Sequence, residues 1–161
     1  MAFDLVTIHT AISFIAIAAG IVVVFDLLRS TYSAFWTVLF LLTSIATSAT
    51  GYLFPFSGVL PSHIVGGVAL LVLAVVLAAR YAFGLGGGWR KVDAAGLVAS
   101  LYFSVFVLVA QAFAKVPSLH VLAPTQSELP FAVAQLTLLV LFVVIGVAAT
   151  RDSGRLSHMP A

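Results

Sequence analysis

The sequence predicts an all-α integral membrane protein, a bundle of five transmembrane helices that forms a single domain over residues 1–161. Two observations carry this prediction. Hydrophobic residues make up 63% of the chain and charged residues 7%, whereas an ordinary soluble domain has about 45–50% and about 25%. Five apolar runs are also long enough to cross roughly 30 Å of hydrocarbon. Strands are not expected, because these runs are apolar on all sides rather than alternating.

The five predicted spans follow one another with short breaks that contain charged residues, Pro or Gly. The first begins directly after "MAFD", which has no Lys or Arg, so we interpret it as a permanent span and not as a signal peptide. The second contains six Ser or Thr residues and is the weakest; a four-span alternative would make it re-entrant. The expected spans cover about residues 5–28, 34–54, 62–83, 93–115 and 130–150.

The basic residues predict the orientation of the bundle. Five spans place the two termini on opposite sides of the membrane, and Lys and Arg favour the cytoplasmic side. One side receives six of the seven basic residues, and the other receives only Lys115. We therefore expect the N-terminus outside and the C-terminus in the cytoplasm. The cytoplasmic group comprises Arg29, Arg80, Arg90, Lys91, Arg151 and Arg155.

So few basic residues exclude a nucleic-acid surface. The expected partners are the lipid bilayer and other membrane subunits or further copies of the chain. The chain has no Cys, which excludes a disulfide, a thiolate metal site and a Cys nucleophile. It also contains no GxSxG, HExxH, phosphate-binding loop or dinucleotide fingerprint, so the sequence leaves open whether the protein is an enzyme.

Histidines gather at the predicted outer end of the bundle. His9 lies about five residues into the first span, and His63 begins the third, which runs in the same direction. Helical spacing places small residues beneath each of them: Ser13, Ala16 and Gly20 below His9, and Gly66 and Gly67 below His63. A flat ligand could occupy the space that these small residues leave between the first and third spans. The leading hypothesis is therefore a periplasm-facing b-type haem for electron transfer, ligated by His9 and His63 and admitted by Ser13, Gly66 and Gly67.

Other interpretations of the same residues stay open. A transition metal could be bound by His9, His63 and His120, with Glu128 as a further ligand. Small residues at helical spacing also allow helices to pack closely with no ligand at all. The protein would then be a non-catalytic accessory or structural subunit of a larger membrane complex. A small transporter or channel is a third possibility, although no repeat or mid-membrane charge indicates one.

Two further contacts are expected from depth and composition. Asp26 should pair with Arg29 or Arg80 at the cytoplasmic boundary. The long outer loop from Val116 to Leu129 should fold back onto the bundle, because its apolar side chains would otherwise be exposed.

Segments along most of the chain resemble a group of small uncharacterised bacterial inner-membrane proteins. The resemblance is carried by "SATGYLFP", "PSHIVGG" and "VFVLVAQAFAKVPSLHVLAPTQSELPFAVAQ". It implies a multi-pass protein of the bacterial inner membrane and no assigned activity. The early "IHTAISFIAIAAGIVVVFDLL" is more loosely similar to small haem-associated membrane cytochrome-like families. The chain departs from their pattern in having no pairs of histidines at both membrane faces.

Overall fold

A computed structural model describes residues 4–54 and 61–153, and every regular element among them is helical. Five of the helices are long and apolar enough to span a membrane, which confirms the predicted all-helical fold with five long apolar helices. The elements are α1 (Leu5–Leu28), α2 (Ala34–Gly51), α3 (Pro61–Leu77), η1 (Ala78–Ala82), α4 (Trp89–Lys115), α5 (Pro117–Leu122) and α6 (Leu129–Ser153).

The helix ends differ from the predicted ones by up to four residues. The second span ends at Gly51, three residues early, and the fourth begins at Trp89, four residues early. The third changes from an α-helix to one turn of π-helix at Ala78. The first begins as expected, because the Asp4 side chain accepts a hydrogen bond from the Thr7 backbone N–H at 2.7 Å and so caps the helix.

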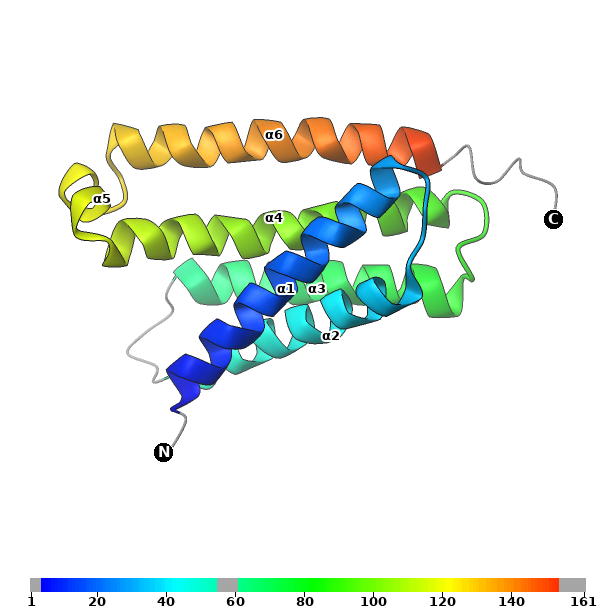
Figure 1. The fold of residues 1–161 in the computed structure, drawn as a ribbon, viewed down its shortest axis with the longest axis horizontal. Coiled ribbons are helices and arrows are strands. Elements are labelled where there is room, and N and C mark those ends of the chain that lie inside the picture. The colour runs from blue at the N-terminus through cyan, green and yellow to red at the C-terminus, as the bar shows by residue number, and fades with distance from the viewer. Residues whose placement is uncertain (1–3, 55–60, 154–161) are drawn as a thin grey trace.

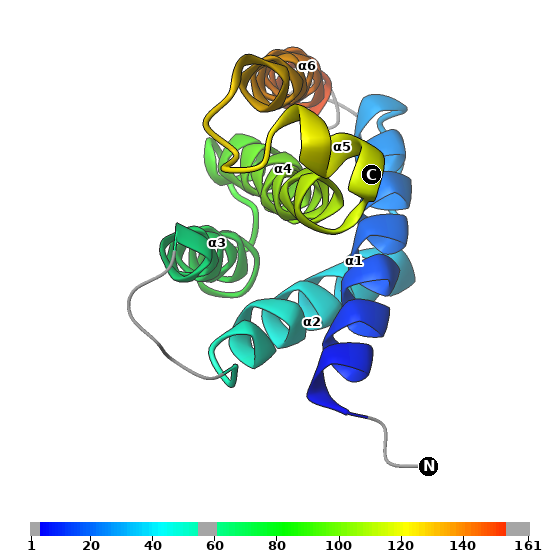
Figure 2. The same ribbon diagram turned by 90° about the vertical axis from the view of Figure 1, so that its left-hand side faces the viewer.

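Successive long helices run in opposite directions, so the bundle has two ends (Figure 1). Helices α3, α4 and α6 lie nearly parallel, with α4 in the middle, while α1 and α2 cross them at an angle (Figure 2). Helix α1 packs mainly on α2, and α4 packs mainly on α6 and α3. The end that holds the start of α1 and the end of α2 also holds α5, and it carries the predicted histidine site.

The opposite end carries the α1–α2 turn, η1 and the start of α4. The basic residues of these elements therefore lie together, as the sequence predicted. Arg155 belongs to the C-terminal tail, which lies outside the described residues. Which end faces the cytoplasm stays a prediction.

Apolar side chains of α1, α2, α3, α4 and α6 meet in one core. Its largest fully buried members are Phe40, Leu73, Val76 and Leu97. Two glycines allow the helices to approach closely there. A Cβ on Gly20 would lie 2.7 Å from Phe40 Cε2, and a Cβ on Gly96 would overlap Val76 Cγ2. The core fills the middle of the bundle and separates its two polar ends.

The loop after α4 folds back only in part. The Gln126 side chain donates a hydrogen bond to the Ala110 carbonyl at 2.8 Å, and Ala123 is fully buried. The short helix α5, which sequence reasoning missed, begins with Pro117 at a position where the missing N–H costs nothing. Of the apolar side chains expected to be covered, Leu119 is half-buried, but Val116, Val121 and Leu122 stay exposed, so the expectation was wrong for these three.

Candidate functional site

His9 is anchored by the end of α2. Its Nδ1 lies 2.8 Å from Thr50 Oγ1, and its ring contacts Phe54 edge-on, with 5.2 Å between ring centroids. A Cβ on Gly51 would lie 3.8 Å from His9 Cε1. The half-buried imidazole is therefore held by three residues of one neighbouring segment.

The hydrogen bonds of Thr50 determine which nitrogen of His9 carries the proton. The Thr50 hydroxyl has one hydrogen and lies 2.7 Å from the Ala46 carbonyl, to which it donates. With that hydrogen donated to a carbonyl, the hydroxyl accepts from His9, and we assign the hydrogen of the neutral ring to Nδ1. In neutral His9 the lone pair is consequently on Nε2, which is available to accept a proton or bind a metal. Metal-ligating histidines commonly have this arrangement, with the other ring nitrogen donating to a fixed partner.

His63 contacts a different residue of the same segment. The Tyr52 ring stacks on the His63 ring with 5.7 Å between centroids, and the Tyr52 hydroxyl donates to the His63 carbonyl at 2.7 Å. A Cβ on Gly67 would lie 3.0 Å from the Tyr52 hydroxyl oxygen, and a Cβ on Gly66 would lie 3.5 Å from its ring. The two glycines thus accommodate Tyr52. A haem on this face would require Tyr52 to move.

The small face below His9 is likewise in contact with protein. Ser13 donates its hydroxyl to the His9 carbonyl at 2.7 Å, Ala16 is fully buried, and Gly20 faces Phe40. These small residues serve helix packing. The small residues of the predicted groove therefore contact aromatic side chains of the protein: Phe40 of α2, and Tyr52 directly after α2.

The remaining predicted metal ligands have separate environments. His120 lies exposed on α5. Partial burial raises the pKa of the Glu128 carboxyl, but hydrogen bonds from Thr125 and Ser127 outweigh it and hold the pKa below its ordinary value. The Glu128 carboxylate thus accepts hydrogen bonds within the turn that precedes α6. Among the described residues, no three His, Asp or Glu side chains lie close enough together to hold one metal ion.

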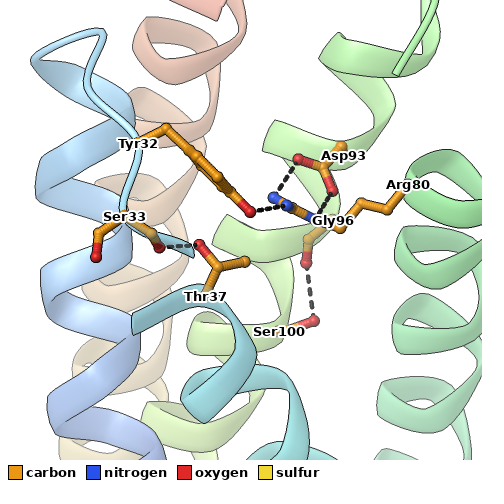
Figure 3. A network of polar contacts seen from close by, with 7 residues as sticks. All are labelled: Tyr32, Ser33, Thr37, Arg80, Asp93, Gly96 and Ser100. Atoms are coloured by element: carbon orange, nitrogen blue, oxygen red, sulfur yellow. Dashed lines mark hydrogen bonds and ion pairs between the residues drawn. The ribbon is translucent and has the colours of Figure 1, made fainter. Parts of the chain in front are cut away.

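A second polar cluster lies at the opposite end, around Arg80 (Figure 3). Its Nη2 donates to Asp93 Oδ2 at 2.8 Å, and its Nε lies 2.7 Å from Asp93 Oδ1. The second contact lacks hydrogen-bond alignment and is an ion-pair contact only. The Arg80 Nη1 donates to the Tyr32 hydroxyl at 3.1 Å, and the guanidinium lies 5.4 Å from the centre of the Tyr32 ring. The side chains of Arg80 and Asp93 are only 8% and 5% exposed.

The π-helical turn η1 brings Arg80 to this position. The Phe83 N–H donates to the Ala78 carbonyl at 3.0 Å, five residues back, which widens the turn. Gly84 and Gly87 then adopt left-handed conformations with φ of 56° and 53°, where glycine is favoured, so that the chain reverses into α4. Asp93 lies one turn into α4 and faces back to η1.

Sequence reasoning missed this ion pair. It expected Arg80 or Arg29 to pair with Asp26, which was wrong. The Asp26 carboxylate accepts from Thr31 at 3.2 Å, and the Arg29 guanidinium lies 5.9 Å from the centre of the Phe25 ring. A usable signal was present: Arg80 and Asp93 flank the glycine-rich turn between two spans and therefore lie at similar depth.

No protein-family model, no curated protein and no solved structure matches the chain.

Proposed function

We propose that the protein is a multi-pass protein of the bacterial inner membrane and acts as a non-catalytic subunit, packing through its helices against further membrane helices. The outward face of α6 carries this proposal. Large apolar side chains follow one another along it at separations of three and four residues, and each is 44–63% exposed: Val133, Leu136, Val140, Val143 and Val147.

This α6 seam has the spacing of helices that wind around each other with a left-handed crossing, the usual packing in membrane bundles. Four of its five members are β-branched. Such side chains hold nearly one rotamer in a helix and lose little freedom when they pack. Inside the chain, α6 packs mainly on α4 and leaves the seam uncovered.

The α6 seam can be tested by adding bulk. Membranes are extracted into lipid nanodiscs, and the mass of the protein-containing particle is measured. We expect Val140→Trp to give a particle with the mass of one chain and its lipid. The control is Leu71→Trp on α3, a residue that is 65% exposed outside the seam, and it should keep the larger particle of the wild type. A wild-type particle with the mass of one chain would contradict the proposal.

A second candidate function is electron transfer through a b-type haem or a transition metal bound to His9. The hydrogen-bonded Nδ1 favours it, because the Nε2 lone pair is then oriented by Thr50. The occupied faces of Gly66, Gly67 and Gly20 weigh against a macrocycle between α1 and α3. A metal ion or a haem would instead have to reach His9 Nε2 from a side other than the space between α1 and α3.

Absorption spectra and metal analysis test this candidate. In cells supplied with haem precursor and with copper, iron and zinc, ligation by His9 predicts a purified protein with a Soret band or a stoichiometric metal. His9→Ala should abolish either signal. His120→Ala should abolish the metal signal if the three histidines share an ion, and should leave a haem band unchanged. Colourless, metal-free wild-type protein would remove this candidate.

The third possibility, a small transporter or channel, has less support. Transport needs a polar path across the bundle. Between the two polar ends, the described residues instead form a closely packed apolar layer that includes Phe40, Leu97 and Leu101, each at most 3% exposed.

A further inference from the structure

Tyr102 lies at the middle of α4, one of the helices long and apolar enough to span a membrane. It lies halfway along the 27 residues of α4, thirteen residues from either end, or about 20 Å at 1.5 Å per residue. Its ring contacts Phe106 on the same helix and Phe142 on α6, with centroid distances of 6.0 and 5.7 Å. Tyr102 is thus held at the junction of α4 and α6.

The Tyr102 hydroxyl makes no hydrogen bond within the described part of the chain. The neighbouring hydroxyls of Ser100 and Ser104 do: they donate to carbonyls of their own helix at 2.8 and 3.1 Å. A tyrosine hydroxyl stands too far from its own helix to do the same. An unpaired hydroxyl in an apolar medium is unfavourable, because it loses the hydrogen bonds that water would make.

Tyr102 lines an apolar groove of about 180 Å³ between α4 and α6 that is open to the outside. The α4 side of the groove contains Ala95 and Ala99, one turn apart, and the α6 side contains Gly146. Small residues at this spacing let another helix approach closely. Val143 belongs both to this groove and to the α6 seam, so the two surfaces are continuous.

The depth of the hydroxyl restricts what can cover it. Lipid acyl chains at the bilayer centre contain no hydrogen-bonding group, so lipid alone leaves Tyr102 unpaired. Copies of one chain insert with the same orientation, and a two-fold axis along the membrane normal therefore brings identical residues together at the same depth. A tyrosine hydroxyl can both donate and accept, so two of them pair with each other.

We propose that the groove between α4 and α6 binds a second copy of this chain, with the two Tyr102 hydroxyls hydrogen-bonded to each other at the bilayer centre. This inference rests on the proposed packing function and names its partner. Ala95, Ala99 and Gly146 allow the approach, and the α6 seam continues the contact toward both ends of the helix.

Tyr102→Phe keeps the ring contacts and removes only the hydroxyl. Energy transfer between two labelled populations in liposomes should show association weakened about threefold to tenfold, the effect of one hydrogen bond between membrane helices. Ala99→Leu fills the groove and should abolish association. The controls are Tyr81→Phe and Ala18→Leu, at exposed positions outside the groove, and both should associate like the wild type. Unchanged association of Tyr102→Phe would overturn the inference.

A photo-crosslinking residue in place of Tyr102 separates this inference from the broader proposal. Two differently tagged copies are expressed together in cells, and the crosslinked product is expected to contain both tags. A product with one tag and additional protein mass overturns pairing with a second copy and leaves the packing function standing. Crosslinking to lipid alone overturns both.

Discussion

Replacing Asp93 by Ala is expected to destabilise the protein by about 3–5 kcal/mol, the usual effect of removing one partner from a buried ion pair. The Arg80 guanidinium would keep its charge on a side chain that is 8% exposed, with Tyr32 as its remaining polar partner in the described part of the chain. Arginine cannot lose its proton there to lower the cost. Unfolding by SDS in mixed micelles, followed by helical circular dichroism, measures the change.

Removing both charges distinguishes two contributions to the free energy of unfolding: the cost of leaving one buried charge unpaired, and the net stabilisation by the ion pair. The double variant Arg80→Met with Asp93→Leu should recover most of the loss, because two apolar side chains replace the pair without leaving a charge. Asp26→Ala serves as the control, since that carboxylate makes only a 3.2 Å contact with Thr31. A loss for Asp93→Ala as small as the control's would contradict the structure's account of this site.

The sequence predicted the number and the approximate bounds of the spans because these depend on local quantities. A run of more than twenty apolar residues has to cross the hydrocarbon as a helix, whatever surrounds it. The depth of His9 and His63 followed in the same way from the rise per residue. The starts of α1 and α3, which contain these two residues, do lie at the same end of the bundle (Figure 1).

The neighbours of each polar side chain could not be predicted from the sequence, because they depend on how each helix is rotated about its own axis. A helix that is apolar on all sides carries no signal for the face that it turns inward. The glycines below His63 were therefore interpreted as space for a ligand, although they accommodate Tyr52, the residue that follows α2. The pairing of Arg80 with Asp93 needs a π-helical turn, which no spacing in the sequence indicated.

Gly96→Ala is expected to destabilise the protein by about 1–3 kcal/mol, the cost of overpacking a core. The added methyl would overlap Val76 Cγ2, which is fully buried on α3. A β-branched side chain in a helix has essentially one rotamer, so Val76 cannot turn away and α3 must separate from α4. Asp93 lies one turn before Gly96, and the separation should also weaken its ion pair with Arg80.

Two variants distinguish this overlap from a general effect of glycine replacement. Gly66→Ala, within α3, would place its methyl 3.5 Å from Tyr52 Cε2, an ordinary contact, and should be neutral or stabilising by up to about 1 kcal/mol through helix propensity. The double variant Gly96→Ala with Val76→Ala removes the overlapping methyl group and should be less destabilised than the two single losses added together. Unfolding in SDS measures the wild type, the glycine control, the two single variants and the double variant. Additive losses in this cycle would show that the two helices do not meet at Gly96, and the packing of α3 on α4 would then have to be different.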